Sequence, residues 1–286
     1  MMKACDVVTA NKLLLDIIKT NLSGEALNWV EAWEATPDQI NGLGKAFVMA
    51  PRKTGKAIVQ PSVLQLAALE DAGLANVSQW SIDRLFRVWL LGNLPATAQD
   101  KLYAAIDQLF LSAEMNEAVA LYSALPFLPF PAIWAKRCAE GIRSNIGSVL
   151  EAIMENNPYP AQYLDEAAWN QLVLKAFFTE KNINLIVGLD ERDNLELALT
   201  LTDYAKERWA AGRKVNPQLW RLVGKFTNEE IFEVLKTGLQ HYDQVEQRAI
   251  ALAVAASDYE PAKDYIDTFP ELKAVLAEGS LSWDKF

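Results

Sequence analysis

The sequence contains one histidine in 286 residues. Zinc sites with paired histidines, Ser-His-Asp triads and Cys-His dyads all need an imidazole beside other catalytic groups. His241 has no such neighbour in sequence, and Thr237-Gly238 just before it indicates a surface position at a helix end. We therefore predict no catalytic residue, no metal site and no cofactor.

The sequence is also poor in cysteine and has no long apolar run. Cys5 and Cys138 lie far apart without C-x-x-C spacing, which disfavours a disulfide framework and indicates a reducing compartment. No run approaches 18 uninterrupted apolar residues, so we predict no membrane span. Asp6 and Asp16 interrupt the apolar pattern of residues 1–20, which is typical of an amphipathic helix rather than a signal peptide. We expect a cytoplasmic protein.

Basic residues are outnumbered, with 27 Lys and Arg against 37 Asp and Glu and a net charge of −10. A field of that sign repels phosphate backbones and anionic lipid. Positive charge concentrates only at Arg52-Lys53 and Lys56, in what we expect to be a basic turn, and three cations do not offset the global charge. We predict no nucleic-acid partner.

Helical periodicity is what the sequence has in abundance. Hydrophobic residues make up 51% of the chain, enough for a substantial core. Helices are expected at 6–19, 23–35, 61–70, 82–91, 97–111 and 114–124, and Pro37 can open another. About a dozen or more helices joined by short turns predict an all-α protein, arranged as a right-handed α-α superhelix or HEAT-like array of helical hairpins.

The clearest interruption of the helical pattern is the proline-rich segment Leu125–Pro131. Three prolines within seven residues are incompatible with a helix interior, which predicts an extended apolar connector. We predict a single helical domain over 1–286. The alternative division is an N-terminal helical part, 1–125, and a second part, 131–286.

The helix expected at 82–91 is amphipathic. Ile82, Leu85, Phe86 and Trp89 form its apolar stripe. Arg84 and Arg87 lie on the other side, where we expect them to be solvated.

Polar side chains gather beside aromatics between Glu140 and Phe226. Such a gathering predicts a polar pocket or an interface, because buried polar groups need partners. Simpler interpretations stay open: Asp193 with Glu196 as a capping box, Gly212 as a C-cap, and Tyr204–Arg208 as a surface stack. The candidate ligand- or partner-binding residues are Arg143, Asn145, Tyr159, Trp169, Asn170, Lys175, Asp190, Arg192, Asn194, Asp203, Glu207, Arg208, Arg213, Trp220 and Arg221.

Several stretches of this region resemble the EboA family. They are Asn157-Pro158-Tyr159-Pro160-Ala161, residues 169–176, Gly188-Leu189-Asp190, the unusual run 207–213, and Leu219-Trp220-Arg221. The family usually has histidine where this chain has Lys206 and proline where it has Lys225. The resemblance implies a bacterial or plastid metabolite cluster, beside a prenyltransferase, that makes or exports a secondary-metabolite precursor.

Two functions follow from the residues and the resemblance together. The favoured function is a non-catalytic helical scaffold or metabolite-binding accessory protein. Its partners would be proteins of the cluster or a small metabolite, and one version of this hypothesis has the metabolite prenylated. The alternative is an enzyme acting on an isoprenoid- or phosphate-bearing intermediate. Asp190, Asp193, Asp203 and Glu207 would then hold magnesium, and Arg192, Arg208 and Arg213 would face a diphosphate. Their spacing does not reproduce the aspartate-rich motifs of terpene synthases.

Overall fold

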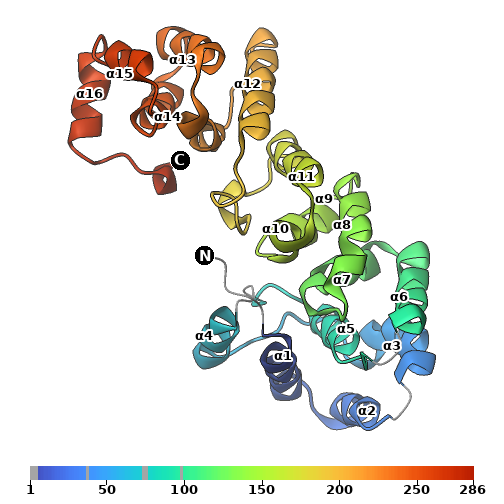
Figure 1. Cartoon of the computed structure of the whole chain (residues 1–286). Coiled ribbons are helices and arrows are strands. Elements are labelled where there is room, and N and C mark those ends of the chain that lie inside the picture. The colour runs from blue at the N-terminus through green and yellow to red at the C-terminus, as the bar shows by residue number, and fades with distance from the viewer. Residues whose placement is uncertain (1–5, 37–38, 73–76, 97–98) are drawn as a thin grey trace. The chain divides into compact units, whose positions relative to one another are not determined.

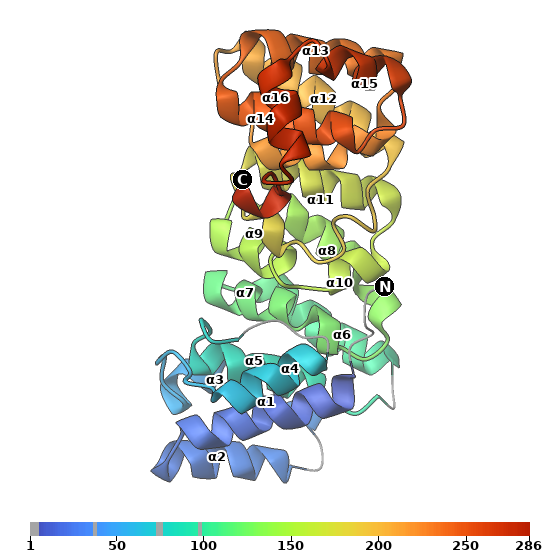
Figure 2. The ribbon, with the colours of Figure 1, turned by 90° about the vertical axis from the view of Figure 1, so that its left-hand side faces the viewer.

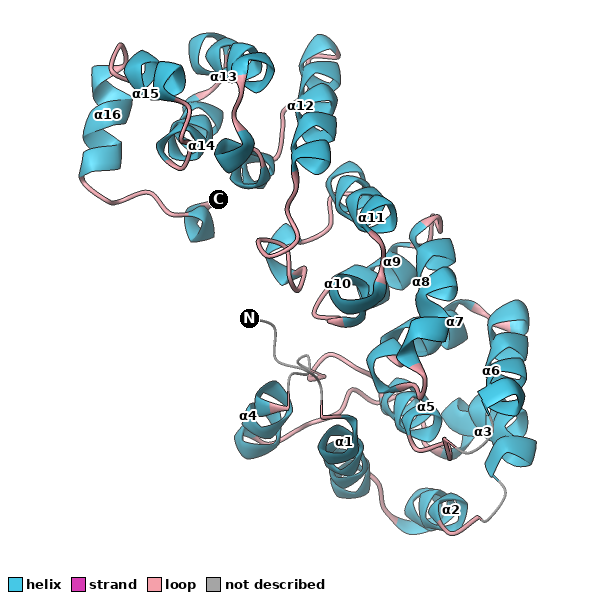
Figure 3. Ribbon diagram, in the orientation of Figure 1, coloured by secondary structure: helices cyan, strands magenta, loops and turns pink. Residues whose placement is uncertain are grey.

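The computed structural model describes residues 6–36, 39–72, 77–96 and 99–286. The predictions made for Cys5, for Pro37 and for a helix start at Thr97 lie outside these residues, as does the side chain of His241. In the described part of the chain there are sixteen α-helices and six 3-10 helices and no strand, so the predicted all-α class is confirmed (Figures 1 and 3). The superhelical arrangement stays a prediction.

The chain divides into two compact units. The first extends to Trp169 and includes Leu185–Gly188, and the second comprises Asn170–Asn184 and Leu189–Phe286. The Leu125–Pro131 connector therefore lies within the first unit. None of the described helices is long and apolar enough to cross a membrane.

The helices of the first unit pack in layers around α5. Helix α5 lies between α1 and α7, and α7 packs against α9 (Figure 2). The helices are α1 (Val7–Asn21), α2 (Gly24–Glu34), α3 (Gln39–Lys53), α4 (Val63–Asp71), α5 (Ile82–Gly92), α6 (Gln99–Ser112), α7 (Met115–Ser123), η1 (Leu125–Phe127), η2 (Pro131–Trp134), α8 (Ala135–Ile142), α9 (Gly147–Met154) and α10 (Tyr159–Tyr163). Helix α3 continues through Arg52 and Lys53, so only Lys56 of the expected basic turn lies outside the helix, after a turn at Thr54-Gly55.

Helix α5 is the centre of this unit. Its arginines, Arg84 and Arg87, were predicted to be solvated, and this prediction is wrong. The stripe of Ile82, Leu85, Phe86 and Trp89 is buried as expected. Arg87 is only 3% exposed, and its guanidinium pairs with Asp83 at 2.9 Å. The reason is that Val88, Leu90 and Leu91 are also buried, so the helix has no solvent face. A buried arginine then requires an anionic or polar partner.

The proline-rich connector was predicted to be extended, and this prediction is wrong. It forms two 3-10 turns, η1 and η2, separated by residues 128–130, and the backbone of Phe130 is left-handed with φ of 53°. Pro126 and Pro131 stand in the first turns of these helices, where a missing N–H breaks no helical hydrogen bond. Helix η2, which begins at Pro131, leads directly into α8.

The second unit packs around α14. Ala249, Ile250, Ala253 and Val254 of this helix are completely buried, and α14 contacts α13, α16 and η4. Helix α11 (Glu166–Phe178) enters this unit at Asn170. The others are η3 (Ile183–Leu185), α12 (Leu195–Ala210), η4 (Pro217–Leu222), η5 (Gly224–Phe226), α13 (Glu229–His241), α14 (Gln244–Ala255), α15 (Glu260–Ile266), α16 (Pro270–Ala277) and η6 (Trp283–Lys285).

Candidate functional site

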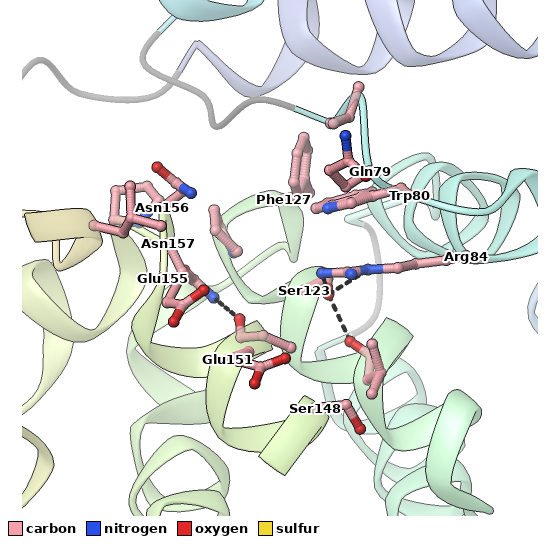
Figure 4. A pocket seen from close by; sticks show the side chains of 16 residues that line it. Gln79, Trp80, Arg84, Ser123, Phe127, Ser148, Glu151, Glu155, Asn156 and Asn157 are labelled. Carbon is pink, nitrogen blue, oxygen red and sulfur yellow. Dashed lines mark hydrogen bonds between the residues drawn. The ribbon is translucent and has the colours of Figure 1, made fainter. Parts of the chain in front are cut away.

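A cavity of about 390 Å³ lies in the first unit, among α5, α7, α9 and the turn that follows α9 (Figure 4). We call it the Arg84 cavity. Its polar lining consists of Gln79, Trp80, Arg84, Ser123, Ser148, Glu151, Glu155, Asn156 and Asn157. Its apolar lining consists of Val77, Val119, Pro126, Phe127, Ala152, Pro158 and Leu185. A cavity with an apolar wall and a few converging polar groups is typical of a small-molecule site.

Arg84 is held by a hydroxyl and an indole rather than by a carboxylate. Its Nε and Nη2 donate to Ser123 Oγ at 3.1 and 2.8 Å, and its Cζ lies 4.1 Å from the centroid of the Trp80 ring. The Ser123 hydroxyl donates onward to the Val119 carbonyl at 2.6 Å. Within the described residues Arg84 makes no ion pair. One edge of the guanidinium is thus engaged, and the two Nη1 protons face no protein acceptor there.

Burial lowers the pKa of Arg84 to about 10, and the charge of Glu151 partly counteracts this effect. The guanidinium is therefore still charged at neutral pH. A cation that has lost much of its hydration gains more from an incoming anion than an exposed arginine does, because the local dielectric constant is lower.

Asparagines shape the opposite wall of the cavity. Asn157 is 5% exposed; its Nδ2 donates to the carbonyls of Tyr122 and Ala152, and its Oδ1 accepts the Tyr159 N–H. Asn156 has a left-handed backbone with φ of 54°, a conformation that asparagine tolerates better than most residues. The turn is thereby fixed between α7 and α9, so the cavity wall is pre-formed.

The sequence-predicted residues of the first unit do not line this cavity. Arg143 and Asn145 are exposed after α8. Tyr159 and Trp169 are completely buried, and the Tyr159 hydroxyl donates to the Pro131 carbonyl at 2.5 Å.

In the second unit, Asn170 and Asn194 are brought together. Their side-chain amides exchange two hydrogen bonds of 3.2 and 2.9 Å. Asn194 also caps α12, because its Oδ1 accepts the Leu197 N–H at 2.9 Å. The expected capping box at Asp193 is therefore wrong by one residue. Asp193 instead pairs with Lys225 at 2.5 Å.

Three of the four acidic residues considered for magnesium, Asp190, Asp193 and Asp203, have separate basic partners. Asp190 accepts from Nε of Arg221 at 2.6 Å and also from its Nη2. Asp203 pairs with Lys206 one turn along α12. No group of three or more His, Cys, Asp or Glu side chains in the described ranges is placed to hold one metal ion.

Arg208 closes the end of α12 rather than stacking closely on Tyr204. Its Nε and Nη2 donate to the Lys214 carbonyl at 2.9 and 2.8 Å, whereas the Tyr204 ring centroid lies 6.0 Å away. Gly212 follows with φ of 66°, the C-cap conformation predicted for it. Of the remaining candidates, Glu207 and Arg213 are exposed, and Lys175 and Arg192 are half-buried.

Trp220 belongs to an aromatic cluster around a buried carboxyl group. It stacks on Trp209 at 5.6 Å, and Trp209 stacks on Tyr242 at 4.4 Å. The Trp209 indole donates to Glu246 Oε1 at 2.9 Å. Burial raises the pKa of Glu246 to about 7, against the opposing effect of the Trp209 indole N–H. The carboxyl group is therefore poised to titrate near neutral pH.

Sequence reasoning missed Arg84 and Glu246, although each carried a signal. Arg84 precedes Val88-Trp89-Leu90-Leu91, an apolar run that leaves α5 no polar face. Glu246 lies on the same helical stripe as Ala249, Ile250 and Ala253, which places a carboxyl group on the buried side of its helix. Ser123 carries no comparable signal, because only tertiary packing brings it to Arg84.

The fold and the Arg84 cavity define an all-α protein with a pre-formed cavity of metabolite size. The model of the family described as metabolite traffic protein EboA matches residues 10–224, which include the whole cavity and all fifteen sequence-predicted residues. The chain belongs to the EboA family, and the resemblance noted from its sequence is confirmed. Neither a curated protein nor a solved structure matches the chain.

Proposed function

We propose that this chain is a non-catalytic accessory protein that binds a small metabolite in the Arg84 cavity. The observation that carries the proposal is Arg84 itself, a largely desolvated cation in a cavity, without an ion-pair partner among the described residues. Leaving such a charge uncompensated is costly, and an anionic ligand would remove that cost.

The size of the cavity and the family support the same function. About 390 Å³ lies within the range of cavities that hold small ligands. The family is described as a metabolite traffic protein, which fits an accessory role in handling a metabolite. That the metabolite is a secondary-metabolite precursor, prenylated or not, and is handled in the cytoplasm for biosynthesis or export, is part of the proposal.

The residues predicted from the sequence belong to the proposal as a second contact region. The amide pair of Asn170 and Asn194, and the Asp190–Arg221 pair, lie in the second unit. We propose that this region contacts partner proteins of the same metabolite cluster. Substitutions there should weaken partner binding and leave metabolite retention by the Arg84 cavity unchanged.

The direct test is retention of metabolites from an extract of the source cells. The protein is incubated with the extract, washed by ultrafiltration, and the retained molecules are identified by mass spectrometry. Arg84→Met removes the cation at similar length, and Arg52→Met is the matched control, because Arg52 is exposed on α3. We expect one or more metabolites on the wild type and on Arg52→Met that Arg84→Met does not retain. The same retained set on all three proteins, or none on the wild type, would refute the proposal.

A further inference from the structure

The donors that Arg84 leaves open determine which ligand group it can take. Ser123 engages the Nε and Nη2 protons on one edge of the guanidinium. The second edge, formed by Nη1 and Nη2, presents two parallel N–H groups without an acceptor among the described residues. Two parallel N–H groups match the two oxygens of a planar carboxylate or two oxygens of a phosphate.

The charges around the cavity distinguish these two groups. Arg84 is the one basic side chain among the described residues that line it, whereas Glu151 and Glu155 line it as well (Figure 4). Glu151 acts electrostatically on Arg84, so its carboxylate lies within range of a charge bound there. A dianionic phosphate would be repelled by two carboxylates and attracted by a single cation. A monoanionic carboxylate that brings its own positive charge matches both signs.

The rest of the lining is suited to an apolar body. Val119, Pro126, Phe127 and Leu185 are among its apolar lining residues, and Phe127 is 3% exposed. Such a wall contributes through the removal of apolar surface from water and carries no further charge.

We infer that the Arg84 cavity binds a small organic zwitterion, with the carboxylate on the open edge of Arg84, an ammonium group facing Glu151 and Glu155, and an apolar side chain against Phe127. An α-amino acid or a close derivative has this arrangement of groups. This inference rests on the proposed function, since it specifies the ligand class of the same cavity.

The test uses the twenty amino acids as probes for the full-length protein, with binding measured by isothermal titration calorimetry. The tightest binder is then compared with its carboxamide, which lacks the negative charge, with its N-acetyl form, which lacks the positive charge, and with inorganic phosphate. We expect the free amino acid to bind at least tenfold more tightly than either blocked form and than phosphate.

Variants assign each part of the recognition. In Arg84→Met the amino acid and its carboxamide should bind equally weakly. In the double variant Glu151→Gln/Glu155→Gln the preference over the N-acetyl form should disappear, whereas preference over the carboxamide remains. Arg52→Met should behave as the wild type. Far-UV circular dichroism and thermal melting report whether each variant is folded. If Arg84→Met is unfolded, the zwitterion inference is tested by comparing the free and blocked probes on the wild type.

Failure of the zwitterion inference can be distinguished from failure of the proposed function. If no amino acid binds, if a blocked form binds as tightly as the free one, or if phosphate binds most tightly, the zwitterion inference is wrong. The proposed function still stands in that case, provided that the extract experiment yields a metabolite whose retention depends on Arg84. If the extract yields none, the proposed function fails with it.

Discussion

Replacing Glu246 by Gln should raise the stability of the protein at neutral and alkaline pH. Glu246 is 4% exposed on α14, and burial raises its pKa from 4.5 to about 7. Glutamine has the same shape and no charge, and its amide oxygen can still accept the 2.9 Å hydrogen bond from the Trp209 indole. The substitution therefore removes the titration and leaves the packing in place.

The direction in which the free energy of unfolding changes with pH depends on whether the folded or the unfolded state binds the Glu246 proton. Between pH 4.5 and 7 the unfolded chain releases the Glu246 proton, whereas the folded protein retains it, so the free energy of unfolding falls as the pH rises. Each unit of pKa shift corresponds to about 1.4 kcal/mol. A shift from 4.5 to about 7 thus costs about 3 kcal/mol, complete above pH 7 and absent below pH 4.5. Because Gln does not titrate, the unfolding free energy of the variant is not lowered in this way.

The assay is urea denaturation of both proteins, monitored by far-UV circular dichroism at pH 4.5, 6, 7 and 8. We expect the difference in unfolding free energy between the variant and the wild type to increase by about 3 kcal/mol from pH 4.5 to pH 8. The difference isolates Glu246, since other carboxyl groups such as Asp193 titrate alike in both proteins. A difference that is independent of pH would refute the assignment of a buried, protonated Glu246.

Three further substitutions test the packing, each by urea denaturation. Arg87→Met should destabilise the protein by about 3–5 kcal/mol, because it leaves Asp83 buried without its cation at 2.9 Å; a loss below about 1 kcal/mol would contradict a buried ion pair. Asn194→Ala should cost about 1–2 kcal/mol through loss of the α12 cap, and an unchanged unfolding midpoint would show that water replaces the cap. Gly224→Ala should cost at least about 2 kcal/mol, since its Cβ would lie 2.4 Å from a backbone oxygen of α14. Gly44→Ala in α3, where a Cβ meets nothing, is the matched control and should be neutral or stabilising.

Much of the local structure was predictable because it depends on neighbours in sequence. The apolar stripe of the helix from Ile82 was predicted from spacing alone, and it is buried. Gly212 was predicted to end its helix, and it does so with a left-handed backbone that glycine adopts without strain. The connector after Leu125 was predicted to interrupt the helices, yet its 3-10 turns were not, because prolines exclude an α-helix without selecting among the alternatives.

The site was less predictable, because its parts come from distant segments. Arg84 and Ser123 are separated by 39 residues, and nothing in either local sequence indicates the other. The same holds for Trp209 and Glu246, which meet across 37 residues. Helical periodicity assigns each residue to a face of its own helix; it does not say which face of another helix will cover it.

The sequence by itself determined the all-α class and the family, and it predicted no imidazole-based catalysis because it contains a single histidine. The tertiary structure decided that Arg84 is half-buried and held by the Ser123 hydroxyl rather than fully solvated. It also decided that a cavity forms beside Arg84 and that Glu246 is buried beside the Trp209 indole. The physical reason is that composition and periodicity report on short-range order, whereas burial, and with it the charge state and available partners of an ionisable group, depends on segments that meet only in the folded chain.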